Sequence, residues 1–171
     1  MKLVIVANTS WYLINFRLGL IEGLIAKGYQ VVSLAPQDEA STQLQTVGCT
    51  FVNLKMDNKG LNPLADFQLK NRLLTIYDEI DPDLIIHYTI KPVIYGSMAA
   101  TKLGIPFVNN ITGLGTAFIK NNWVTWLVKQ LYRSSQKKAG YVFFQNSEDQ
   151  KLFQKENLIP EIVPQEVLPG T

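Results

Sequence analysis

Polar and aromatic side chains that could bind a ligand follow the first apolar run of the chain, residues 2–7. Asn8, Ser10, Trp11 and Asn15 stand in this stretch. Amide and hydroxyl groups beside an aromatic ring suit the hydroxyls and the ring of a sugar. An ordinary capping loop with Trp11 in the core is an equally good interpretation. The stretch has no glycine, which argues against the fingerprint of a dinucleotide-dependent dehydrogenase.

Arg17 comes next, in the first turn of a helix predicted over residues 16–27 with Asn15 as its N-cap. A cation in the first turn opposes the helix dipole. It becomes favourable when the side chain and the helix N-terminus share an anion such as a phosphate. A solvated surface arginine is the alternative. Because this loop is expected at the carboxyl edge of a sheet, we favour the anion.

His87 is the single histidine and ends a second apolar run, residues 84–87. At the carboxyl end of a strand it is a weak candidate for proton transfer, and a structural role is about equally common. Tyr88 follows it. Lys91 precedes Pro92, which is expected to hold it extended, so it could meet a phosphate or a sugar acid, or remain solvated.

A glycine-rich segment, residues 112–116, follows the next predicted strand. Its Thr112, Gly113 and Gly115 expose backbone N–H groups that could cradle an anion, although the pattern alone is weak. One histidine and one cysteine without an acidic cluster predict no metal site, and we expect no cofactor.

A helix predicted over about residues 122–139 carries two tryptophans and a basic stripe. Lys129, Arg133 and Lys137 recur every four residues, and Trp123 and Trp126 precede them. Such a helix could lie on an anionic membrane surface. The alternative is a cover helix with a solvated charged face and tryptophans in the core.

These residues stand on alternating strands and helices. Strands are predicted at residues 2–7, 30–35, 50–54, 84–87, 105–108 and 141–145, with a possible last one at 162–163. Helices are predicted at 16–27, 41–47, 63–80, 93–103, 122–139 and 147–156, the last capped by Ser147 with Gln150. This alternation predicts an α/β fold: a Rossmann-like parallel sheet of about 6–7 strands with helices on both faces.

Composition limits the class of protein. The 171 residues, 47% hydrophobic, fit a single domain over 1–171. A net charge of +2 does not indicate nucleic-acid binding. The lone Cys49 cannot form an internal disulfide, which favours a cytoplasmic location. The sequence contains no run near the ~20 apolar residues of a membrane span.

The ordered motifs resemble the N-terminal domain of family 4, GT-B-fold glycosyltransferases. The resemblance is greatest to the bacterial branch that builds capsule, O-antigen or other lipid-linked glycans. It rests on NFR (15–17), PD (82–83), HYTIKP (87–92), YGS (95–97), NITGLG (110–115), FQNSED (144–149) and LPG (168–170).

The resemblance implies a retaining, metal-independent enzyme with its active site between two Rossmann-like domains. This domain would hold a polyprenyl-pyrophosphate-linked saccharide at the inner face of the cell membrane. A C-terminal domain beyond residue 170, absent from this chain, would bind the nucleotide sugar, so the chain alone would be inactive. The family often has a histidine where Thr112 stands, which puts a histidine-based role in doubt. The implied acceptor-binding residues are Asn8, Ser10, Trp11, Asn15, Arg17, Tyr88, Lys91, Thr112, Gly113 and Gly115.

Two other functions remain open at this stage. The chain could be a non-catalytic membrane-docking module that recruits a separate catalytic subunit. It could also be the N-terminal half of a GT-B-fold sugar-nucleotide epimerase, which would need neither an acceptor nor a membrane.

Overall fold

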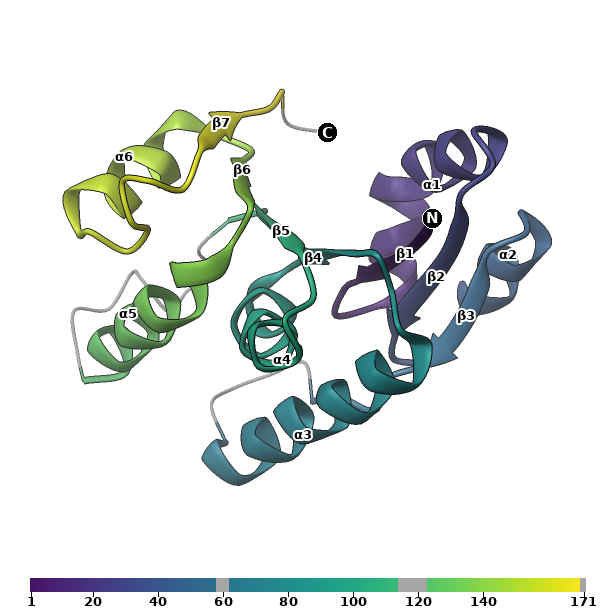
Figure 1. Ribbon diagram of the computed structural model, residues 1–171, viewed down its shortest axis with the longest axis horizontal. Helices are drawn as coiled ribbons and strands as arrows, with labels where there is room; N and C mark the ends of the chain where they lie inside the picture. Colours follow the sequence, from purple (N-terminus) through teal and green to yellow (C-terminus); the bar gives the residue numbers. More distant parts are fainter. Residues whose placement is uncertain (58–61, 114–122, 170–171) are drawn as a thin grey trace.

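The computed structural model describes residues 1–57, 62–113 and 123–169. These residues form a seven-stranded, all-parallel sheet in the order β3-β2-β1-β4-β5-β6-β7 (Figure 1). The predicted fold class is confirmed. The strands are β1 (Lys2–Val6), β2 (Gln30–Ala35), β3 (Thr50–Asn53), β4 (Leu84–Tyr88), β5 (Phe107–Ile111), β6 (Tyr141–Phe144) and β7 (Gln165–Val167).

Helices cover both faces of the sheet. The helices α1 (Ser10–Ala26) and α2 (Ser41–Thr46) pack on one face, over β1 and β2. The opposite face carries α3 (Pro63–Ile80), α4 (Ser97–Leu103), α5 (Trp123–Ser135) and α6 (Ser147–Lys155). The connections between parallel strands are right-handed. They run in one direction along the sheet from β1 to β3 and in the opposite direction from β4 to β7, so the two sets of helices lie on opposite faces.

The first helix starts earlier than predicted. Thr9 is its N-cap, because its hydroxyl oxygen accepts a hydrogen bond from the backbone N–H of Tyr12 at 3.0 Å. The predicted cap, Asn15, therefore lies inside the helix, and its side chain donates to the carbonyl of Trp11. As a result Arg17 stands about two turns from the helix N-terminus, and its predicted place in the first turn is wrong.

The fifth strand lies further along the chain than predicted. Gly104 ends α4 in the left-handed conformation (φ 72°), and the N–H of Ile105 still bonds back to α4. Pairing with β4 therefore begins at Phe107 and includes Asn109 and Asn110, which the sequence had placed in a loop. The sheet therefore fixes the backbone of both asparagines and the face towards which each side chain points.

Two predictions near the carboxyl end of the chain are also wrong. Asn146, not Ser147, caps α6, since its side chain accepts from the N–H of Asp149 at 2.7 Å. The last strand is β7, not residues 162–163. Ile162 lies in a turn and is 90% exposed, and pairing with β6 begins only at Gln165.

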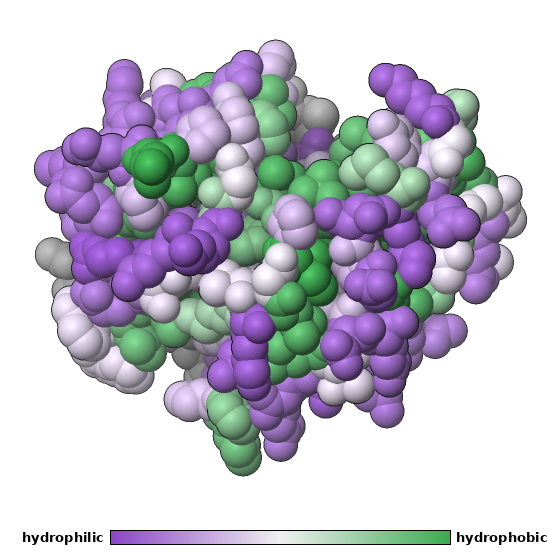
Figure 2. Space-filling model, viewed as in Figure 1, coloured by the Kyte–Doolittle hydropathy of each residue, from purple (hydrophilic) through white to green (hydrophobic). Residues whose placement is uncertain are grey.

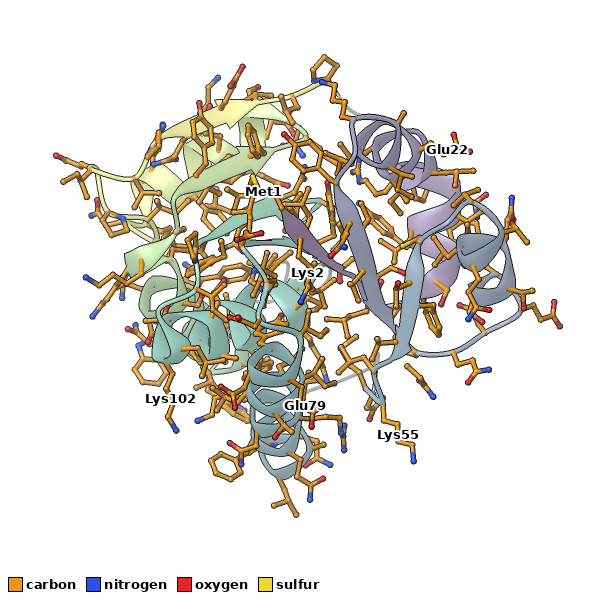
Figure 3. All side chains as sticks on the ribbon, turned by 45° about the vertical axis from the view of Figure 1, so that its right-hand side comes forward. Met1, Lys2, Glu22, Lys55, Glu79 and Lys102 are labelled. Carbon is orange, nitrogen blue, oxygen red and sulfur yellow. The ribbon has the colours of Figure 1, made fainter. Side chains whose placement is uncertain are left out.

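Charged side chains such as Glu22, Glu79 and Lys102 point away from the sheet (Figure 3). Hydrophobic atoms form a band through the middle of the face seen in Figure 2, with hydrophilic atoms on both sides. Among the helices described, none has the length and apolarity to cross a bilayer.

Candidate functional site

An aromatic and cationic cluster lies at the carboxyl edge of the sheet, where α1 meets the end of β4. The rings of Tyr12 and Tyr88 are 5.9 Å apart. The guanidinium carbon of Arg17 lies 4.6 Å from the centre of the Tyr88 ring and 5.5 Å from that of Tyr12. Its Nη2 donates to the Tyr12 hydroxyl at 2.9 Å. The fold thus joins two of the predicted site residues, Arg17 and Tyr88.

The Arg17 charge is nearly buried and has no carboxylate partner among the described residues. The residue is 9% exposed, and its buried Nε has no hydrogen-bond partner in the segments described. Burial raises the pKa of Tyr88 to about 12, and the nearby guanidinium opposes that rise only in part. Tyr88 therefore stays neutral at physiological pH, and the contacts of Arg17 with both tyrosines are cation–π contacts.

Of the other predicted site residues in the segment 8–15, one is buried and the remaining three are at least partly exposed. Ser10 is fully buried, and its hydroxyl donates to the carbonyl of Pro36 at 2.9 Å. Trp11 is 56% exposed, so its alternative role as a core residue is wrong. Asn15 is exposed and Asn8 is half-buried. Trp11, Asn15 and Asn8 therefore present polar and aromatic atoms at the surface of this edge, whereas Ser10 fastens α1 to the end of β2.

His87 lies inside the molecule and not on this surface. Its side chain is fully buried, with Nδ1 2.9 Å from Asn109 Oδ1 and Nε2 3.0 Å from the Tyr77 hydroxyl. Because Asn109 Nδ2 donates to Ser97, its Oδ1 accepts, which assigns the proton to Nδ1. Burial lowers the His87 pKa to about 4, and the bond to Asn109 offsets only part of this. We therefore leave His87 out of the proposed site.

Lys91 is engaged within the chain. Its Nζ lies 2.9 Å from Asp66 Oδ1 of α3, and Tyr95 donates to the other carboxylate oxygen at 3.1 Å. Its backbone is helical, not extended as predicted from Pro92 (φ −67°, ψ −46°). This ion pair joins α3 to the π-helical turn η1 (Pro92–Gly96) that leads into α4.

Two residues of the glycine-rich segment lie at the end of β5. Thr112 and Gly113 are half-buried, and Gly113 has φ +126°, a conformation that favours glycine. The predicted site residue Gly115 lies outside the described residues. Two buried oxygens nearby have no hydrogen-bond partner within the described part of the chain: Thr89 Oγ1, just after β4, and Asn110 Oδ1, in β5. Asn110 was not among the predicted site residues, because the predicted strand ended at residue 108 and β5 extends to Ile111.

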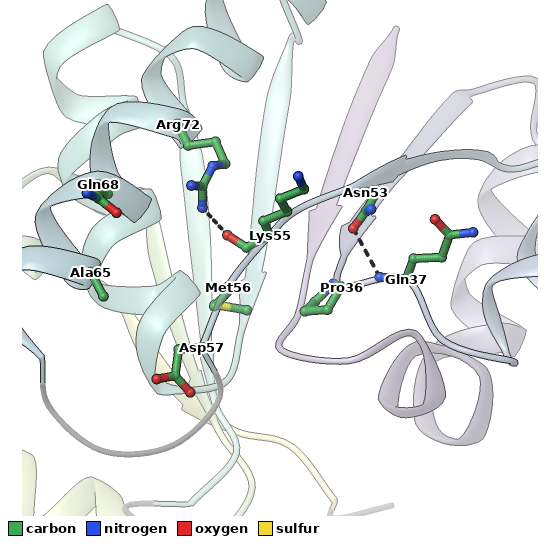
Figure 4. A pocket seen from close by; sticks show the side chains of 9 residues that line it. All are labelled: Pro36, Gln37, Asn53, Lys55, Met56, Asp57, Ala65, Gln68 and Arg72. Carbon is green, nitrogen blue, oxygen red and sulfur yellow. Dashed lines mark hydrogen bonds between the residues drawn. The ribbon is translucent and has the colours of Figure 1, made fainter.

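A cavity of about 520 Å³, lined by both polar and apolar side chains, opens at the carboxyl ends of β2 and β3, beside α3 (Figure 4). Asn53 accepts from the N–H of Gln37 at 3.1 Å, and Arg72 donates to the carbonyl of Lys55. Sequence reasoning missed this cavity, because its walls come from two strand ends and a distant helix. The lining residues are Pro36, Gln37, Asn53, Lys55, Met56, Asp57, Ala65, Gln68 and Arg72.

The predicted basic stripe on α5 is largely used within the chain. Lys129 lies 3.0 Å from Glu156 Oε1, and Arg133 donates to the carbonyls of Glu156 and Asn157 at 2.8 and 3.1 Å. Lys137 lies beyond α5, in the short helix η3 (Gln136–Lys138), and is exposed. These bonds hold α5 against the end of α6.

The two tryptophans of α5 are exposed and not in the core. Trp123 is 73% and Trp126 63% exposed, and on the neighbouring α3 Leu64 and Phe67 are 68% and 56% exposed. A mainly apolar groove of about 240 Å³ lies between α3, α4 and α5, with Leu127 and Leu131 in its wall. This part of the surface is therefore mainly apolar, and its Lys70 lies over the ring of Phe67.

The part of the chain that the structure describes contains no group of three His, Cys, Asp or Glu side chains able to hold a metal ion.

The contacts at the carboxyl edge are aromatic, amide, hydroxyl and guanidinium groups. Such groups bind and orient polar ligands.

The doubly wound parallel sheet defines a Rossmann-like domain of the kind that forms half of a GT-B fold. The profile of the family described as glycosyl transferase 4-like matches residues 2–146, and the chain belongs to this family.

Known proteins agree with this assignment. The chain is 25% identical over 168 residues to the N,N'-diacetylbacillosaminyl-diphospho-undecaprenol alpha-1,3-N-acetylgalactosaminyltransferase of Campylobacter jejuni, covering 93% of this chain and 45% of that protein. A Rickettsia africae glycosyltransferase superposes with a TM-score of 0.69 at 12% identity, over 98% of this chain and 42% of that one. Anabaena Alr3699/HepE in complex with UDP-glucose gives 0.67 at 19% identity, over 99% and 44%. The chain thus spans less than half the length of these proteins.

Proposed function

We propose that this chain is the acceptor-binding half of a retaining glycosyltransferase. The complete enzyme moves a sugar from a nucleotide-sugar donor to a lipid-linked saccharide, as in the synthesis of bacterial surface polysaccharides. A second Rossmann-like domain binds the donor and completes the active site between the two domains. The Campylobacter relative, whose name contains a diphospho-undecaprenol acceptor, supports the choice of a lipid-linked substrate.

The observation that carries this proposal is the cluster of Tyr12, Arg17 and Tyr88 at the carboxyl edge, with the exposed Trp11 on the same helix α1. An exposed aromatic ring beside amide groups fits a sugar, and a guanidinium with no carboxylate partner among the described residues fits a phosphate. The glycine-rich turn that binds a nucleotide pyrophosphate in dinucleotide-dependent enzymes is absent after β1. This combination suits the acceptor better than the donor nucleotide.

The apolar surface formed by α3 and α5 supports a place for this domain at the inner face of the cell membrane. Leu64, Phe67, Trp123 and Trp126 are each more than half exposed, and large apolar side chains gathered at a surface can mark an interaction site. Tryptophan rings favour the boundary between lipid headgroups and acyl chains. Docking through this surface would keep the domain close to a lipid-linked acceptor.

The test is a transfer assay with the full-length protein, a panel of nucleotide sugars and a polyprenyl-diphosphate-linked saccharide. We expect transfer with retention of the anomeric configuration, and none from residues 1–171 alone. Turnover by residues 1–171 alone would contradict the assignment of this chain as half of an enzyme. Conversion of the free nucleotide sugar without an acceptor would indicate an epimerase instead.

A further inference from the structure

Three buried polar atoms at the carboxyl edge have no hydrogen-bond partner among the residues that the structure describes: Arg17 Nε, Thr89 Oγ1 and Asn110 Oδ1. Buried polar groups in native proteins are almost always paired, and an unpaired one destabilises the fold. Arg17 is 9% exposed and Asn110 5%, so solvent satisfies neither side chain well. Three such atoms in one region of the fold need a common explanation.

The sheet register places Asn110 beside the cation–π cluster. Asn110 of β5 pairs with Tyr88 of β4 on one side and with Phe143 of β6 on the other. Ladder partners in a parallel sheet point to the same face. Tyr88 stacks on Arg17 of α1, so Asn110 lies on the α1 face, one strand away from the ring that contacts the guanidinium. Thr89 directly follows Tyr88.

Aromatic rings flank Asn110 along this face. Tyr88 and Phe143 are its two ladder neighbours, and Phe143 stacks on Tyr141 with ring centres 4.6 Å apart. Phe143 and Tyr141 are both half-buried. An amide oxygen between aromatic rings resembles the surroundings that proteins give to a sugar ring, with apolar faces and one or two hydroxyl partners.

We propose that Arg17, Tyr88 and Asn110 form a subsite for a sugar that carries an anionic oxygen group. Arg17 Nε donates to the anion, which replaces the neutral Tyr12 hydroxyl as the main partner of the guanidinium. Asn110 Oδ1 accepts a hydrogen bond from a sugar hydroxyl, and Thr89 Oγ1 takes a second. The anion is either the phosphate of a glycosyl phosphate or the carboxylate of a uronic acid, since both fit one guanidinium.

This proposal rests on the proposed acceptor role and adds the chemical class of the sugar. Arg17 and Asn110 have separate tasks in it. Arg17 distinguishes charged from neutral sugars, because its partner is the anion. Asn110 distinguishes a sugar from a bare anion, because its partner is a hydroxyl.

The experiment measures binding of small probes to the full-length protein by calorimetry. The probes are N-acetylglucosamine, its 1-phosphate, glucuronic acid and inorganic pyrophosphate. We expect one of the two charged sugars to bind at least about ten-fold more tightly than the neutral sugar. Which of the two does so identifies the source of the anion.

Two variants separate the tasks. Arg17→Met keeps a side chain against Tyr88 and removes the charge, and we expect it to lose the preference for the charged sugar. Arg17→Lys should retain part of it. We expect Asn110→Ala to weaken binding of the charged sugar by about three- to ten-fold and to leave pyrophosphate binding unchanged.

The controls are Arg72→Met, in the cavity beside α3, and Asn71→Ala, on the exposed side of α3, with melting temperatures measured for every variant. Equal affinity for charged and neutral sugars, an unchanged preference in Arg17→Met, or its loss in Arg72→Met instead would overturn the subsite. If the enzyme transfers sugar but Arg17→Met binds normally, the subsite fails and the proposed function stands. If Arg17-dependent binding is found without any transfer, the proposed function fails and the subsite stands.

Discussion

Gly96 is the residue on which the buried polar network around His87 depends. A Cβ at position 96 would lie 2.5 Å from His87 Nε2 and 2.9 Å from the Tyr77 hydroxyl. The network cannot shift easily, because His87 also bonds Asn109, whose amide donates to Ser97 and Gln136. The absence of a side chain at this position therefore lets η1 approach β4 closely enough to place Tyr95 beside Asp66.

We expect Gly96→Ala to destabilise the protein by about 1–3 kcal/mol, because it overpacks a rigid core. Gly19→Ala is the matched control. Gly19 is an exposed residue of α1 with no atom within 4 Å of a built Cβ, so alanine there should stabilise by about 0.5–1 kcal/mol. Urea unfolding followed by circular dichroism measures both. Equal effects of the two changes would contradict the close contact with His87.

The sequence predicted individual site residues unevenly. Arg17 and Tyr88 were selected from residue type and strand position, and the fold does bring them together. Lys91 and His87 were selected in the same way, yet both are used within the chain. Their partners, Asp66, Tyr77 and Asn109, lie in other elements, and no local pattern shows which distant side chain will reach a given residue. Asn110 was missed for a simpler reason, the shifted boundary of β5.

Among the elements, those with strong local signals were predicted well. β2 was predicted with its observed bounds, and α3 begins and ends as predicted, with Pro63 in its first turn. Elements with competing signals were shifted. Several residues near each helix start could serve as the N-cap, and only the observed hydrogen bonds identify Thr9 and Asn146. Tertiary pairing with β4 decided where β5 begins.

The cap of α6 can be tested by two neighbouring substitutions. Asn146→Ala removes an acceptor from the N–H of Asp149, so we expect a loss of about 1 kcal/mol of stability. Ser147→Ala changes the residue that the sequence had indicated as the cap. Because Ser147 is exposed and lies after the true cap, we expect its effect to stay within about 0.5 kcal/mol. A larger loss for Ser147→Ala, measured by thermal unfolding, would show that the helix starts one residue later.

For the whole molecule, the carboxyl edge and the α3–α5 surface are built from different elements. The carboxyl edge takes its proposed ligand contacts from α1, β4 and β5, and the α3–α5 surface takes its apolar side chains from the two helices on the opposite face. Changes on one should therefore leave the other intact. The sequence predicted a membrane-facing α5 but not the engagement of Lys129 and Arg133 with the end of α6.

We expect the full-length protein to bind lipid vesicles mainly through apolar side chains. The double change Trp123→Ser and Trp126→Ser should weaken binding about ten-fold or more, as expected when two large apolar side chains are lost. Salt should weaken binding to anionic vesicles only modestly, because the exposed side chains of this surface are mainly apolar and Lys129 is paired with Glu156. Trp11→Ser is the matched control and should bind vesicles normally. An equal loss for Trp11→Ser in a sedimentation assay would refute the assignment of the docking surface to α5.

All three tryptophans of the chain are more than half exposed, at 56%, 73% and 63%. Their emission in the folded protein should already resemble that of indole in water, so intrinsic fluorescence will be a poor measure of unfolding. The same exposure makes it a good measure of contact. Lipid would shift the emission of Trp123 and Trp126 to the blue, whereas a sugar would quench or shift that of Trp11. Single-tryptophan variants would thus report on each surface separately in the same cuvette.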